Sequence, residues 1–132
     1  MQTALDLADL VGGRVRRFTV TEPVFKVEPL FLLGCSFESL KHYMHDRYRQ
    51  DVGIYEGQLG TMFTFDKAPY RVIWTERLDR AVVLHEVFHL VTRICSDRGI
   101  VIRAHDEQGN CGDETAAFLF EFFARAVLRR LK

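Results

Sequence analysis

The alternation of apolar and polar positions in the first 50 residues predicts a short helix, two strands and an amphipathic helix. Two glycines follow residues 3–10, so we expect a short helix that ends there. Residues 14–33 are rich in Val, Phe and Thr and are interrupted near Glu22, which is typical of two strands or a hairpin. Ser36 is a typical N-cap for the next helix, which the apolar spacing extends to about Arg49. The inward face of that helix is expected to carry Phe37, Leu40, Met44 and Tyr48.

The pattern in the rest of the chain predicts a second hairpin followed by two long helices. Residues 51–60 hold three glycines and are expected to form a loop. Residues 61–65 and 70–74 are strand-like, and the turn residues between them indicate a hairpin. Helices are expected over residues 76–95 and 113–130. Strands first and helices last indicate the α+β class, with a small antiparallel or mixed sheet against the two helices.

The first of the two long helices, for which Thr75 is the expected N-cap, separates its apolar and polar residues onto two faces. A helix turns by about 100° per residue, so with His85 at 0° the side chains of His85, Glu86 and His89 fall between 0° and about 100°. The apolar residues fall between about 140° and 300°, and they are Val83, Leu84, Val87, Phe88, Leu90, Val91 and Ile94. One face is therefore predicted to join the core and the other to line a cleft.

The polar face carries an HExxH motif, which indicates a metal site. The two histidines are four residues apart, so both imidazoles lie on one side of the helix and can bind one Zn²⁺ ion at about 2.0–2.1 Å. Glu86 lies close enough to reach a water on the metal without being a ligand itself. It is the candidate general base for that water, whose pKa zinc lowers towards 7.

A tetrahedral zinc site needs a third protein ligand and leaves a fourth position for water. The candidates downstream of the motif are Cys95, His105, Asp106, Asp113, Glu114 and Glu121. A continuing helix turns Cys95 about 80° away from His85, which disfavours the thiol. Glu114 opens the last helix 25 residues after His89, and an antiparallel helix beside the first could present its carboxylate to the metal. Glu114 is therefore the preferred third ligand, with Asp113 as the alternative.

The sequence also predicts where several other polar and aromatic residues lie. Glu121 stands between two phenylalanines, and as a buried carboxylate it would need a partner, such as a ligand histidine that it orients. His42 and His45 could bind metal but are expected on a solvated helix face. The phenylalanine-rich stretch 118–123 is expected in the core or in a subunit contact.

The segments HEVFHL and GDETAAFL together resemble a known family. They look like the gluzincin arrangement, in which HExxH is completed by a glutamate on a later helix. The resemblance is closest to small phage and prophage zincin-like metallopeptidases, in which a D-E-x-x-A-[YF]-L stretch follows the HExxH helix. It covers about residues 70–130.

This resemblance implies a zincin-like fold and a peptidase site. It assigns the zinc ligands to His85, His89 and Glu114 and the catalytic base to Glu86. It also implies that the strand near residues 70–74 is the sheet edge that pairs with an extended peptide substrate. Larger gluzincins place an aspartate four residues after the third ligand, and Phe118 stands at that position here.

Composition and charge limit the classes of binding partner and the cellular location that we expect for the protein. The 132 residues suit one domain, 1–132, and the 18 basic and 18 acidic side chains give no net charge, which argues against nucleic-acid binding. No apolar run approaches the roughly 18 residues that span a membrane, and the first residues do not resemble a signal peptide. Three cysteines without a CxxC pair favour reduced thiols and a cytoplasmic location, or the virion if the protein is phage-encoded.

The sequence therefore predicts a zinc metallopeptidase that acts on a protein or peptide substrate. A competing hypothesis is a catalytically weak or inactive zincin-like module that serves as an assembly subunit, for example among the structural proteins of a phage particle. The peptidase hypothesis needs an open metal position and a cleft beside an edge strand. The assembly hypothesis needs an apolar contact surface and would survive the loss of Glu86.

Overall fold

Four strands form a mixed sheet in the computed structural model, which describes residues 15–53, 57–102 and 113–132. The strands are β1 (Arg16–Thr19), β2 (Leu30–Leu33), β3 (Gly60–Thr64) and β4 (Arg71–Thr75), in the spatial order β1-β2-β4-β3. β2 and β4 are parallel, and the two outer pairs are antiparallel. The hairpin predicted over residues 61–74 is present, and the two strands predicted within residues 14–33 pair antiparallel.

The two central strands are apolar throughout because both of their faces are covered. All four residues of β2 are buried, and side chains alternate between two separate cores on the two sides of the sheet. Phe31 and Ile73 join one core, whereas Leu32 and Trp74 join the other. This arrangement corrects the expectation that residues 70–74 form the sheet edge, because β4 is internal and β3 is the edge strand in the described part of the chain.

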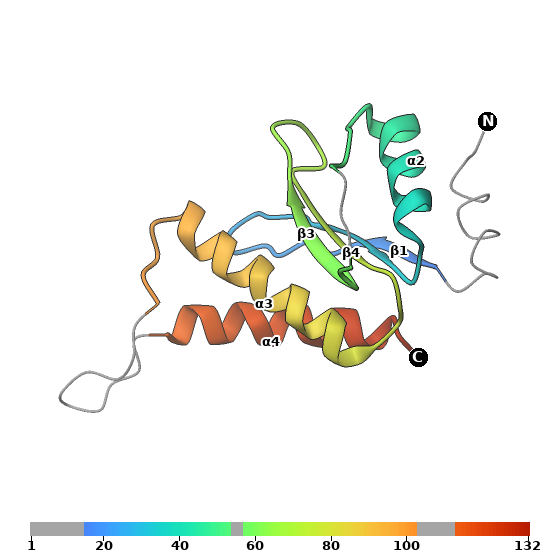
Figure 1. Cartoon of the computed structure of the whole chain (residues 1–132). Helices are drawn as coiled ribbons and strands as arrows, with labels where there is room; N and C mark the ends of the chain where they lie inside the picture. Colours follow the sequence, from blue (N-terminus) through green and yellow to red (C-terminus); the bar gives the residue numbers. More distant parts are fainter. Residues whose placement is uncertain (1–14, 54–56, 103–112) are drawn as a thin grey trace, which may run out of the picture.

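Helices cover the two faces of the sheet unequally (Figure 1). α2 (Phe37–Tyr48) packs on one face, with Ser36 as the N-cap that the sequence predicts: its hydroxyl accepts a hydrogen bond from Ser39 N. α3 (Arg80–Asp97) and α4 (Glu114–Arg129) lie side by side on the other face and run antiparallel. The fold is therefore α+β, with three helices among the described residues. None of these helices is long and apolar enough to cross a membrane.

α3 begins four residues later than the sequence predicts. The N-cap is Asp79, whose carboxylate accepts hydrogen bonds from Ala81 N at 2.8 Å and Val82 N at 3.2 Å. The expected cap, Thr75, is instead the last residue of β4, and its hydroxyl donates to the carbonyl of Arg77. The aspartate is the better cap because it satisfies two of the backbone N–H groups that the first turn of a helix leaves unpaired.

The link between β1 and β2 is organised by a buried carboxylate. Glu22 is fully buried and accepts hydrogen bonds from Val24 N at 2.9 Å and Phe25 N at 2.6 Å. Its backbone pairs with that of Val27, and Arg98 at the end of α3 donates to the Phe25 carbonyl. The interruption predicted near Glu22 is thus a tight turn that is connected to α3.

Two cysteines lie in the two cores and are expected to be unreactive. Burial raises the pKa of the Cys35 thiol to about 12 and also raises the pKa of Cys95. Because the thiolate is the reactive form, both should resist alkylation in the folded protein. In a Cys111→Ser background, iodoacetamide should label no thiol under native conditions and two thiols in denaturant, as counted by mass spectrometry. Rapid native labelling of Cys95 would contradict this packing of α3.

Some predicted features lie outside the described residues. They are the short helix expected at residues 3–10, and the loop that carries His105, Asp106 and Cys111.

Candidate metal centre

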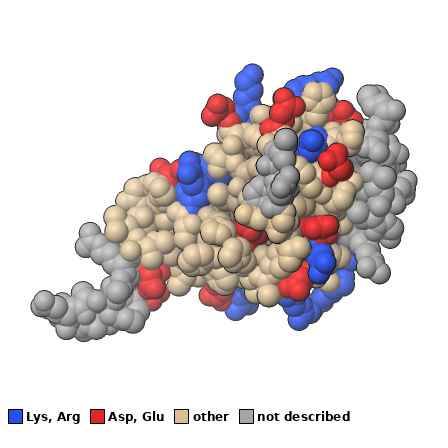
Figure 2. All heavy atoms as spheres, in the orientation of Figure 1, with Lys and Arg blue, Asp and Glu red and all other residues tan. Residues whose placement is uncertain are grey.

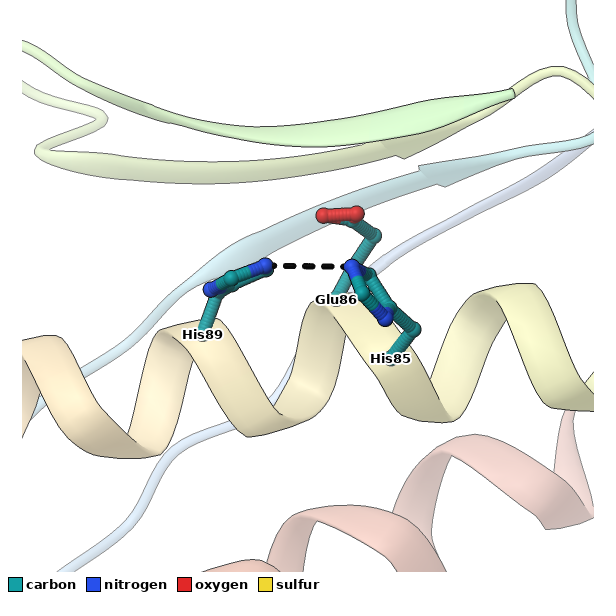
Figure 3. Close-up of side chains that lie close together, drawn as sticks. All are labelled: His85, Glu86 and His89. Carbon is teal, nitrogen blue, oxygen red and sulfur yellow. Dashed lines mark hydrogen bonds between the residues drawn. The ribbon is translucent and has the colours of Figure 1, made fainter. Parts of the chain in front are cut away.

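The two motif histidines face each other one helical turn apart on α3 (Figure 3). His85 Nε2 and His89 Nε2 are 3.1 Å apart, and the ring centroids are 4.7 Å apart with an angle of 80° between the ring planes. Both residues are exposed. The His89 ring also lies 6.4 Å from the Phe88 ring, measured between ring centroids.

This geometry fits a shared divalent metal ion. With bonds of about 2.0–2.1 Å, two nitrogens 3.1 Å apart would subtend an angle of about 100° at the ion, close to the tetrahedral value. The oxygen of Glu86 lies within 4.8 Å of both imidazole ligand atoms. These three residues form the only group of three or more metal-ligating side chains found among residues 15–53, 57–102 and 113–132.

Glu86 differs from the histidines because it is buried. Its exposed fraction is 4%, and its carboxylate points towards the sheet edge above α3 (Figure 3). Removal from water raises the pKa of Glu86, and the nearby His89 and His85 partly oppose this shift. A carboxylate with a raised pKa is a stronger proton acceptor, which suits the role of general base that the sequence predicts.

Gly60, the first residue of β3, makes room for Glu86. A Cβ atom at position 60 would lie 2.9 Å from the Trp74 carbonyl oxygen and 3.2 Å from Glu86 Cγ. The absence of a side chain therefore lets the edge strand pass directly over the glutamate. Gly60 was expected at the end of a glycine-containing loop but begins β3, and nothing in the sequence alone relates it to Glu86.

Gly60→Ala is expected to disturb the site. The added methyl group cannot fit without moving β3 or the Glu86 side chain, so we expect a loss of about 1–3 kcal/mol of stability. Urea denaturation would measure it. Gly53→Ala is the matched control, because a Cβ there meets nothing within 4 Å. Equal stability of the two variants would contradict the close approach of β3 to Glu86.

The histidines and Glu86 line an open cleft of about 1040 Å³ between β3 and α3. Residues 58–62 form one wall, and the side of α3 from Ala81 to Ser96 forms the other. The edge of β3 therefore borders the same space as the metal-ligating side chains.

The buried stripe of α3 is rotated relative to the sequence prediction. Glu86 was expected on the polar face but is buried, whereas Phe88 was expected in the core but is 56% exposed. The difference comes from tertiary packing: β3 passes over the side of α3 that carries Glu86, whereas the ring of Phe88 stays mostly exposed.

The structure does not bring Glu114 to the histidines. Glu114 is exposed in the first turn of α4, which begins on the side of the molecule where α3 ends, whereas His85 and His89 lie in the first ten residues of α3 (Figure 1). The adjacent Asp113 is exposed as well, and neither carboxylate belongs to the cluster. The role of Glu114 as third ligand, with Asp113 as the alternative, stays a prediction.

Two other candidates have roles outside the site. Cys95, which its helical angle disfavours as a ligand, is buried in the core between the sheet, α3 and α4. Glu121 was expected to be a buried carboxylate that orients a ligand histidine, and this prediction is wrong. Its side chain is 62% exposed and pairs with Arg125 one turn later at 2.7 Å. Its neighbours in the sequence turn towards the core while Glu121 itself faces solvent.

The second histidine pair occupies a solvated helix face, as predicted. His42 and His45 are exposed on α2, and His45 Nδ1 lies 3.1 Å from the Asp51 carboxylate. They belong to no metal-ligating group among the described residues.

Comparison of the chain with protein-family models, with curated proteins and with solved structures finds no match.

Proposed function

We propose that this protein is a zinc-dependent metallopeptidase. The observation that carries the proposal is the combination of two imidazole nitrogens 3.1 Å apart and a buried glutamate beside them, all bordering one cleft. A metal-binding pair alone would be compatible with a structural site. A carboxylate kept close to the pair without being needed as a ligand is what hydrolysis by an activated water requires.

Each residue has a separate task in this reaction. A Zn²⁺ ion held by His85 and His89 would supply a Lewis acid for the scissile carbonyl and lower the pKa of a water molecule towards 7. Glu86 accepts a proton from the attacking water. It then donates that proton to the amine nitrogen as the C–N bond breaks, which restores the carboxylate.

An extended peptide is the substrate that the cleft fits. β3 is paired on one side only in the described chain, so its other side offers backbone N–H and C=O groups at the cleft. A peptide that paired with this edge would place its backbone carbonyls along α3, near the histidines.

The third ligand belongs to the proposal as well. We assign it to Glu114, whose carboxylate would have to move towards the histidines when the metal binds. Because Glu114 lies outside the group formed by His85, Glu86 and His89, a second candidate function is a zincin-like assembly module with a weak or inactive site, for example in a phage particle. The two functions differ in their need for Glu86, because only hydrolysis uses it.

A cleavage assay tests the proposed function. The zinc-loaded protein should cleave members of a fluorescence-quenched peptide library, 1,10-phenanthroline should abolish cleavage, and added Zn²⁺ should restore it. Cleavage that persists in the chelator would point to a contaminating or metal-independent protease. No cleavage of any peptide by a protein shown to contain zinc would favour the assembly function.

A further inference from the structure

The cleft between β3 and α3 has two chemically different ends. Next to the N-terminal part of α3 it is lined by apolar side chains, those of Leu59, Ala81 and Val82. Beyond His89 it is lined by polar side chains, including those of Arg93 and Ser96. A peptide lying along β3 would therefore meet an apolar surface on one side of the histidines and a cation on the other.

Among the described residues that line this cleft, Arg93 is the only Lys or Arg and Glu86 is the only acidic residue. Bound Zn²⁺ would add two positive charges to these. The lining, counted with the metal, is then net positive, which favours a substrate with negative charge.

The guanidinium of Arg93 is held in place without being neutralised. Its Nε lies 3.3 Å from one oxygen of the Asp97 carboxylate. Arg71 of β4 donates a hydrogen bond to the other oxygen of the same carboxylate. Two arginines share one aspartate, so the group of three keeps one positive charge. No hydrogen bond joins either Nη of Arg93 to the described residues, and its side chain is 50% exposed.

The position of Arg93 along α3 defines which substrate residue it can reach. Arg93 is six residues beyond the midpoint of the two histidines, which corresponds to about 9 Å at 1.5 Å per residue. An extended peptide covers that distance in about three residues at 3.3 Å each. The side chain two or three residues from the scissile bond would thus lie opposite Arg93.

We propose that the cleft selects acidic peptides, through an ion pair between Arg93 and an Asp or Glu side chain two or three residues from the scissile bond. The guanidinium offers its two Nη groups to a carboxylate, a geometry in which lysine is not equivalent. Because the position is counted from the scissile bond, this part of the inference rests on the proposed peptidase function. An exposed pair of this kind should change affinity by about two- to fivefold, and more on charge reversal.

A binding experiment tests the charge preference without catalysis. Fluorescein-labelled decapeptides that carry either Glu or Lys at alternate positions are titrated with zinc-loaded Glu86→Gln protein, and anisotropy is read. We expect the acidic peptide to bind more tightly at low salt, with the difference shrinking as salt increases. Arg93→Gln should remove the preference and Arg93→Glu should invert it. Arg80→Gln, which alters a cation on α3 that does not line the cleft, should leave it unchanged.

A cleavage experiment separates this inference from the proposed function. The wild-type protein digests a mixture of natural peptides, and mass spectrometry reads the residues around each cleavage site. Enrichment of Asp or Glu two or three residues away, lost in Arg93→Gln, is the expected result. Cleavage without that enrichment, or the same enrichment in Arg93→Gln, would overturn the role of Arg93 while the peptidase stands. Arg93-dependent binding without Glu86-dependent cleavage would refute the peptidase and leave an acidic-peptide site.

Discussion

Glu86→Gln should lower peptide hydrolysis by about 10²–10⁴-fold while the protein still folds and binds zinc. The amide has nearly the same shape as the carboxylate and fits beneath Gly60, but it cannot accept a proton from water. The histidines that hold the metal are unchanged. The loss should therefore be in kcat, with little change in zinc content or melting temperature, and single-turnover kinetics on a cleaved peptide would measure it.

The matched control is Glu121→Gln, which removes a carboxylate that is exposed on α4 and paired with Arg125. This variant should retain full activity. If Glu86→Gln and wild-type protein cleave equally well, Glu86 is not the general base, and its burial beneath β3 would need another explanation.

Phe123→Ala should destabilise the protein by about 3–5 kcal/mol. Phe123 is fully buried where α4 meets the core residues of α3, among them Val87 and Leu90. Removing the ring leaves a cavity between the two helices, and the side chains of the sheet cannot move far enough to fill it. Because α3 carries the metal ligands, loosening its packing should also weaken zinc binding. Urea denaturation measures the free energy of unfolding, and titration with Zn²⁺ measures the affinity for zinc.

Phe118→Ala provides the comparison on the same helix. Phe118 is 48% exposed, so its removal should cost less than about 1 kcal/mol. A large loss at Phe118 and a small one at Phe123 would mean that α4 packs with a different face. On the face of the molecule shown in Figure 2, uncharged side chains cover much of the surface over α3 and α4.

The parts of the site that the sequence predicted are those fixed by local geometry. A spacing of four residues puts His85 and His89 on one side of any α-helix, and the structure confirms this without help from the rest of the chain. The same holds for the hairpins and for Ser36 as a cap, because each depends on residues close together in the sequence.

The parts that could not be predicted depend on distant segments. That β3 is the edge strand follows from β2 pairing in parallel with β4, a contact across about 40 residues. The burial of Glu86 and the exposure of Phe88 follow from where β3 crosses α3, and no pattern within the helix contains that information. Glu121 was misplaced because its two phenylalanine neighbours suggested burial, although adjacent helical residues point in different directions.

Metal content per chain shows directly whether the His85–His89 pair is a metal site. Elemental analysis should find about one zinc in wild-type and Glu86→Gln proteins supplied with zinc, and little in His85→Ala or His89→Ala. Glu114→Ala in the same series should lose zinc if Glu114 is the third ligand. No zinc in the wild-type protein, or undiminished zinc in both histidine variants, would show that His85 and His89 do not form a metal site.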